Sequence, residues 1–144
     1  MEQVHLESPS VQSYLTILQG VISRMASNSA SSKTWCIALV SAIVVTTADK
    51  AEAEYVWISL IPIVLFFHLD SYYLGLERSF RQRYNAFIKK LHEGQATVED
   101  VFIIAPAGAG SRLAGTAKAA TSVSVWPFYV LLVAMLLIVK RFVL

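Results

Sequence analysis

The side chains of this chain that could do chemistry are few, and they lie far apart along the sequence. His68 and Asp70 are close neighbours, but residues two apart point to different faces of a helix, so we expect no acid–base pair there. Cys36 lies in an apolar run, where a thiol is a small buried hydrophobe rather than a reactive thiolate. No Cys/His cluster has zinc-ligand spacing. We therefore expect no catalytic residue, no metal site and no cofactor.

One glycine-rich segment shares part of its spacing with a phosphate loop. Residues 110–116 (GSRLAGT) carry two glycines at the required separation. Thr116, however, occupies the position of the lysine that reaches the phosphates, and Lys118 follows two residues too late. We therefore expect no nucleotide site, and we interpret residues 105–122, rich in Ala, Gly, Ser and Thr, as a linker.

The composition indicates a membrane protein. Of 144 residues, 56% are hydrophobic and 15% are charged, whereas soluble domains have about 25% charged residues. The net charge of +2 gives no general attraction to nucleic acid, and we expect none to bind. Three nearly uncharged runs cover residues 34–48, 55–69 and 124–139. Each is shorter than the roughly 20 residues that cross the hydrocarbon, so each must include flanking residues or lie at the interface.

The first two runs belong to longer helices. Apolar residues spaced by three and four continue from Val11 to Met25 and from Tyr73 to Leu91. The connection at 49–54 therefore separates two helical arms of equal length, 11–48 and 55–92, each of about 38 residues or 57 Å. The predicted fold is an all-α integral membrane protein. Its parts are a long antiparallel transmembrane helical hairpin with cytoplasmic extensions (1–94), a linker (95–123) and a third, C-terminal apolar helix (124–144).

Two short stretches of the linker have local signals of their own. Residues 97–100 (TVED) resemble a helix start with an acidic first turn. Residues 101–104 (VFII) either continue that helix or form a short buried strand.

The charge distribution predicts the orientation of the hairpin. The connection at 49–54 is net acidic, whereas five basic residues follow the second run: Arg78, Arg81, Arg83, Lys89 and Lys90. Because positive loops stay in the cytoplasm, we place both distal ends of the hairpin, including the N-terminus, on the cytoplasmic side of a bacterial inner membrane. Basic residues flank the third run almost equally, which leaves its direction open.

The same register predicts two ion pairs. In an antiparallel pair closed at 49–54, facing residues have numbers that sum to about 103, which places Lys33 opposite Asp70 and Arg24 near Glu77. A charge at the inner edge of a membrane is normally kept when it is paired or reaches the interface. The alternative is that Lys33 extends to the interface while Asp70 lies in water.

The cytoplasmic arms suggest partners. The basic run is predicted to bind anionic lipid, at roughly 1 kcal/mol per charge near the surface, or a cytoplasmic protein. Several large side chains point to more than one side of the arms, which predicts an interface and a homo-oligomer; they are Tyr14, Leu18, Phe80, Tyr84 and Phe87. In a closed ring, Ser41 and Thr46 are our candidates for the lumen, unless such hydroxyls bond to their own helix.

Two stretches carry a family resemblance. One is 24–26 (RMA) with 28–29 (NS), Lys33 and Trp35, and the other is 69–74 (LDSYYL) with 77–78 (ER) and 80–81 (FR). They resemble small bacterial membrane proteins and, more loosely, the two-transmembrane effectors of nucleotide-signalling antiphage systems. The likeness covers residues 10–92 and transfers no active-site residue. It implies a protein that oligomerises and compromises the inner membrane when triggered, although the third run departs from the two-span pattern.

These observations favour a non-enzymatic inner-membrane protein that self-associates, as a pore-forming or membrane-disrupting defence effector. The alternative is a structural or accessory membrane subunit whose basic cytoplasmic stalk docks a partner protein or anionic lipid.

Overall fold

The computed structural model describes residues 8–50, 53–104 and 109–142, and within these ranges it contains helices and no strand. The helices are α1 (Pro9–Lys50), the 3-10 helix η1 (Ala53–Ser59), α2 (Leu60–His92), the 3-10 helix η2 (Val98–Asp100), α3 (Ala109–Ala120) and α4 (Trp126–Phe142). The prediction of an all-α chain is confirmed. Residues 101–104, one of whose two predicted states is a strand, form a turn and irregular chain.

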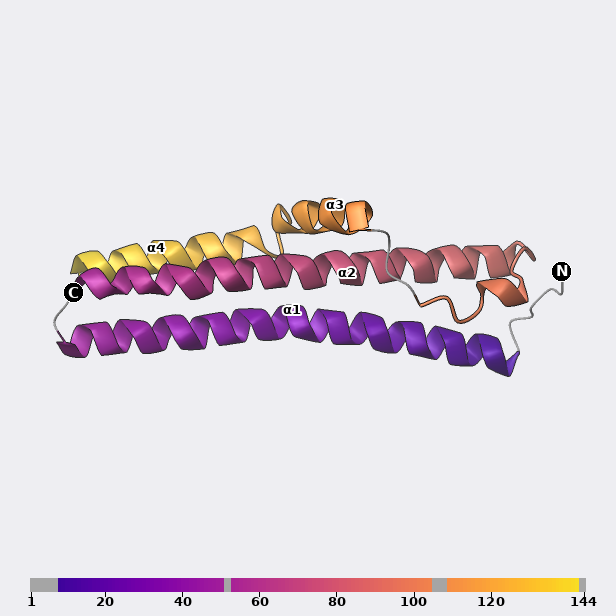
Figure 1. The fold of residues 1–144 in the computed structure, drawn as a ribbon, viewed down its shortest axis with the longest axis horizontal. Helices are drawn as coiled ribbons and strands as arrows, with labels where there is room; N and C mark the ends of the chain where they lie inside the picture. Colours follow the sequence, from indigo (N-terminus) through magenta and orange to yellow (C-terminus); the bar gives the residue numbers. More distant parts are fainter. Residues whose placement is uncertain (1–7, 51–52, 105–108, 143–144) are drawn as a thin grey trace.

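Helices α1 and α2 run antiparallel beside each other along their lengths (Figure 1). Pro9 opens α1 at the position where its missing N–H costs nothing. At the same end of the pair, Gly94 stops α2 with a φ of +67° that suits glycine. Two helical segments, Pro9–Lys50 and Ala53–His92, are long and apolar enough to cross a membrane.

The second arm differs from the prediction at its start. Residues 53–59 form η1, and the α-helix begins only at Leu60. A 3-10 helix rises about 2 Å per residue against 1.5 Å for an α-helix. The short apolar run therefore covers more distance than its residue count implies.

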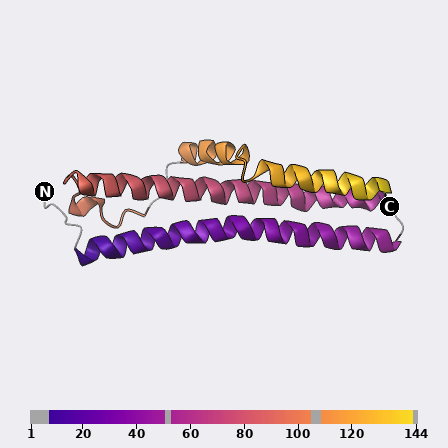
Figure 2. The same ribbon diagram turned by 180° about the vertical axis from the view of Figure 1, so that it is seen from behind.

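The predicted linker contains a helix. Helix α3 lies along α2 on the side away from α1 (Figures 1 and 2). A Cβ added to Gly75 would lie 3.1 Å from the backbone of Gly115, so the two helices touch backbone to backbone. Small residues spaced by four supply this contact on both helices: Ser71, Gly75 and Ser79 on α2, and Ser111, Gly115 and Ala119 on α3.

Helix α4 lies beside the first part of α2 and runs antiparallel to it (Figure 1). The Tyr129 hydroxyl donates to the carbonyl oxygen of Phe66 at 3.0 Å. Near the far end, Lys140 Nζ lies 3.0 Å from a Glu54 carboxylate oxygen and 4.5 Å from the Trp57 ring centre. These contacts give the direction that the sequence leaves open: α4 ends beside η1.

The large side chains of the arms are buried. Tyr14, Leu18, Phe80 and Phe87 form one core with Val11, and Tyr84 packs against it partly buried. The chain after α2 covers this core, since Ala96 is buried in it and the Tyr14 hydroxyl donates to the Ile103 carbonyl at 3.0 Å. The predicted exposed aromatic patch is therefore wrong, and self-association loses that support.

The exterior changes character along the long axis. Where α1, η1, α2 and α4 lie together, large apolar side chains are exposed on every helix, among them Trp35, Val45, Ile61, Val64, Leu131 and Met135. We call this zone the apolar belt. In residues 9–32 of α1 and 73–92 of α2, which we call the stalk, Ile17 is the only exposed large apolar side chain. The belt thus has the polarity of a surface that faces lipid, and the two stalk helices have that of a surface facing water. The segment that packs on the stalk exposes four apolar side chains, Val98, Phe102, Ile103 and Ile104.

Candidate functional site

A buried charge cluster lies between α1 and α2 where the stalk meets the belt. Asp70 is completely buried. One of its carboxylate oxygens lies 2.5 Å from Lys33 Nζ, and the other accepts a hydrogen bond of 2.5 Å from the Ser29 hydroxyl. Lys33 keeps 22% of its side chain exposed. The ion pair that the register predicts is present, and Ser29 is a partner that the register argument missed.

The second predicted pair is wrong. Glu77 accepts a hydrogen bond of 2.7 Å from Arg81, one turn further along α2. Arg24 and Glu77 are both described, and no ion pair joins them. Their numbers sum to 101, two short of the register, so an i,i+4 partner on the same helix lies closer to Glu77 than Arg24 does.

The basic run after the second apolar segment does not form one face. Its five members have different partners: Arg78 donates to the Ser122 hydroxyl, Arg81 pairs with Glu77, Arg83 donates to the Ile103 carbonyl, Lys89 pairs with Glu93, and Lys90 pairs with Asp100. These partners lie on α2 itself, on the chain after α2, and on the turn after α3. The prediction of a single lipid or partner surface therefore divides into separate local sites.

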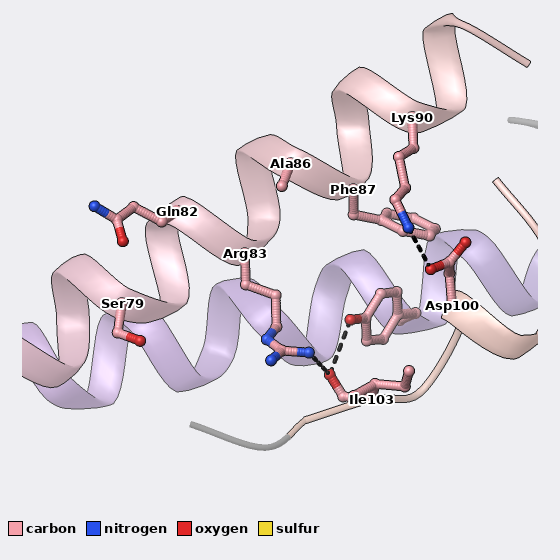
Figure 3. A pocket seen from close by; sticks show the side chains of 9 residues that line it. Ser79, Gln82, Arg83, Ala86, Phe87, Lys90, Asp100 and Ile103 are labelled. Carbon is pink, nitrogen blue, oxygen red and sulfur yellow. Dashed lines mark hydrogen bonds and ion pairs between the residues drawn. The ribbon is translucent and has the colours of Figure 1, made fainter. Parts of the chain in front are cut away.

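One of these sites is a cleft of 380 Å³ in the stalk, lined by both polar and apolar side chains (Figure 3). In it, Lys90 Nζ lies 2.7 Å from an Asp100 carboxylate oxygen, and the Ile103 carbonyl accepts from both Tyr14 and Arg83. Burial raises the pKa of Tyr14, so its hydroxyl stays protonated as a donor. The hydrogen bond from Lys90 lowers the pKa of Asp100, which stays ionised. These groups satisfy one another and clamp residues 97–103 onto the stalk.

A second cleft, of 260 Å³, opens between α2 and α3. Arg78 lines it from α2, and Arg112 and Lys118 line it from α3. Sequence reasoning missed this site because it placed Arg112 and Lys118 in a linker. The available signal was the spacing of small residues by four at Ser111, Gly115 and Ala119.

The two hydroxyls proposed for a lumen do not share a polar surface. Thr46 donates to the carbonyl of Ala42 on its own helix at 2.9 Å. Ser41 lines a groove of 480 Å³ between α1 and α4 whose other lining residues are all apolar. His68 is exposed, and Cys36 is buried. Within the described ranges, no group of three His, Cys, Asp or Glu side chains is placed to hold a metal ion.

Comparisons with protein-family models, with curated proteins and with solved structures find no match to this chain.

Proposed function

We propose that this chain is a non-enzymatic accessory subunit of a bacterial inner membrane, with a three-helix membrane segment and a cytoplasmic stalk that docks a partner. The apolar belt is the observation that carries the membrane part of this proposal. Exposed side chains such as Val45, Val64 and Leu131 surround the segment built from α1, η1 with α2, and α4. Exposing such an apolar surface to water is unfavourable, whereas contact with lipid acyl chains is not.

Charge supports the orientation. Nine of the twelve Lys and Arg residues lie toward the stalk from the belt, whereas Lys50, Lys140 and Arg141 lie at the other end. By the positive-inside rule, the stalk and the N-terminus are cytoplasmic. The buried Lys33–Asp70 pair then lies at the inner boundary, where an ion pair costs less than at the bilayer centre.

A matched pair of lysine substitutions tests membrane insertion. Val64 is exposed in the belt and Ile17 is exposed in the stalk. We expect the wild-type chain and the Ile17→Lys variant to stay in the membrane pellet after alkaline carbonate extraction. The Val64→Lys variant should insert less, because a lysine inside a span costs about 2.5–3.5 kcal/mol. Release of the wild-type chain by carbonate, or equal behaviour of the two variants, would contradict the proposal.

The groove between α1 and α4 favours a second candidate function, a self-associating membrane-disrupting effector. It is apolar, lies within the belt, and is wide enough at 480 Å³ to take side chains of a helix from a second copy. The test is disulfide crosslinking of Ser41→Cys in a Cys36→Ala background, together with a membrane-potential dye during expression. Monomer alone and an unchanged potential would reject the effector.

A further inference from the structure

We infer that the cleft between α2 and α3 binds the phosphate headgroup of an anionic phospholipid. Three cations converge there from two helices: Arg78 from α2, and Arg112 and Lys118 from α3. No Asp or Glu lines the cleft, and none of the three makes an ion pair within the described part of the chain. Three like charges around 260 Å³ repel one another, and an anion between them removes that repulsion.

The cleft also offers the right donors. Arg78 donates to the Ser122 hydroxyl at 2.7 Å, which orients its guanidinium and uses one of five N–H groups. Ser79, Gln82 and Ser111 add hydroxyl and amide donors to the same lining. Arginine with neutral donors is the usual recognition set for a phosphate group. The rest of the lining includes Leu76 and the small residues Gly75, Ala114 and Gly115, so backbone lies close to the ligand.

The position of the cleft along α2 favours a lipid phosphate over a free one. Gly75 lies five residues beyond Asp70, which is about 7.5 Å along the helix axis. The headgroup layer begins where the hydrocarbon ends and is about 5–7 Å thick on each side. With Asp70 at the hydrocarbon edge, Gly75 lies at the outer edge of this layer, from which long basic side chains can extend back to a lipid phosphate. The belt aromatic Trp126 opens α4 near the same boundary. The inference rests on the proposed function, because it needs the belt to lie in the bilayer.

The test is thermal unfolding of the full chain in detergent, titrated with phosphatidylglycerol, with phosphatidylcholine of the same acyl chains, or with inorganic phosphate. A ligand that binds the folded state raises the midpoint, so the titration gives an apparent affinity. We expect phosphatidylglycerol to raise the midpoint and phosphatidylcholine to leave it unchanged. The Arg112→Gln/Lys118→Gln double variant should weaken the phosphatidylglycerol affinity about thirtyfold. Both residues are exposed, so the helices should form normally.

Two further variants serve as controls. Arg81→Gln/Lys89→Gln removes the same charge from exposed stalk positions outside the cleft and should change the affinity less than about twofold. Arg112→Lys/Lys118→Arg keeps the charge and should retain binding.

Equal response to both lipids, or equal losses in the two glutamine variants, would overturn the site. An equal response to inorganic phosphate would overturn the lipid source. A chain that resists carbonate but shows no lipid preference refutes this inference alone, whereas release by carbonate refutes the proposed function.

Discussion

At the scale of single residues, Asp70 is held from one face of α1. Ser29 and Lys33 are four residues apart, and each binds one oxygen of the same carboxylate. A slip of α1 against α2 would leave a fully buried charge without partners, which is a strong penalty. The cluster therefore fixes the register between the two long helices, and we regard it as structural rather than catalytic.

The first prediction concerns this pair. Lys33→Met should lower the free energy of unfolding by about 3 kcal/mol, because it leaves the Asp70 charge buried without its partner. Ser29→Ala should cost about 1.5 kcal/mol, the value of a hydrogen bond to a charged group. The charge swap, Lys33→Asp with Asp70→Lys, should be more stable than either single exchange. Denaturant unfolding in detergent measures the stability of each variant. A charge swap that is no more stable than Lys33→Asp or Asp70→Lys alone would show that the ion pair does not stabilise the fold.

The second prediction concerns Asp100. Its two carboxylate oxygens accept hydrogen bonds from Lys90 and from the Thr97 backbone, and the first of these lowers its pKa. Because the folded-state pKa is depressed, the stabilisation is complete above the ordinary value of about 4 and is lost as the pH falls through the folded-state pKa. Asp100→Asn should loosen residues 97–103 at neutral pH by about 1 kcal/mol.

Hydrogen exchange followed by mass spectrometry measures this effect segment by segment. We expect faster exchange in residues 97–103 of Asp100→Asn and an unchanged rate in the belt. Glu99→Gln is the control, since Glu99 lies beside Asp100 and makes none of its contacts. Equal changes in both variants would mean that the clamp contributes nothing.

Residue-level contacts were predictable only where one geometric rule applied. The antiparallel register places Lys33 beside Asp70 because both lie on the seam between α1 and α2. The same rule fails for Glu77, since a partner one turn away on its own helix competes with Arg24. The contacts of Tyr14 and Arg83 with the Ile103 carbonyl could not be predicted from the sequence, because they depend on the path of the chain after Gly94.

At the scale of elements, α3 shows how a composition can indicate opposite states. Alanine, glycine and serine suggest a flexible linker, yet alanine is the strongest helix former. Spaced by four, the small residues of α3 form a flat stripe that meets a matching stripe on α2. The helices α1 and α2 could be predicted because large apolar residues recur in them with helical spacing. The small residues of α3 give no such hydrophobic periodicity, so this helix was not predicted.

The third prediction tests this contact. Gly75→Leu should undock α3, because a side chain at this position meets the Gly115 backbone at 3.1 Å and backbone has little room to give. Overpacking of this kind costs about 1–3 kcal/mol. Gly20→Leu is the matched control: nothing lies within 4 Å of its added Cβ, so it should be neutral or stabilising. Limited trypsin cleavage at Arg112 and Lys118 reports the undocking, and equal cleavage of both variants would contradict it.

At the scale of the whole molecule, polarity is inverted between the two ends of one continuous helix pair. In the stalk, aromatic side chains are inside and charges are outside. In the belt, apolar residues lie both inside and outside. Thr46 and Thr47 bond within their own helix, and the Tyr129 hydroxyl bonds across to α2. The sequence predicted α1 and the α-helical part of the second arm, but not η1. It predicted the existence of α4 but not its direction, which depends on the pairing of Lys140 with Glu54.

The last prediction is the topology that follows from this inversion. With the stalk in the cytoplasm, Lys50 and Arg141 lie at the outer end of the belt and Lys89 lies on the inner side. In a Cys36→Ala background, Lys50→Cys and Arg141→Cys should react with an impermeant thiol reagent added outside intact cells. Lys89→Cys should react only after the membrane is opened. Labelling of positions 50 and 89 from the same side would reject the two crossings. Labelling of position 141 only from inside would reject the direction of α4. The neighbouring Lys140 pairs with Glu54, so the end of α4 and the start of η1 must lie on the same side of the membrane.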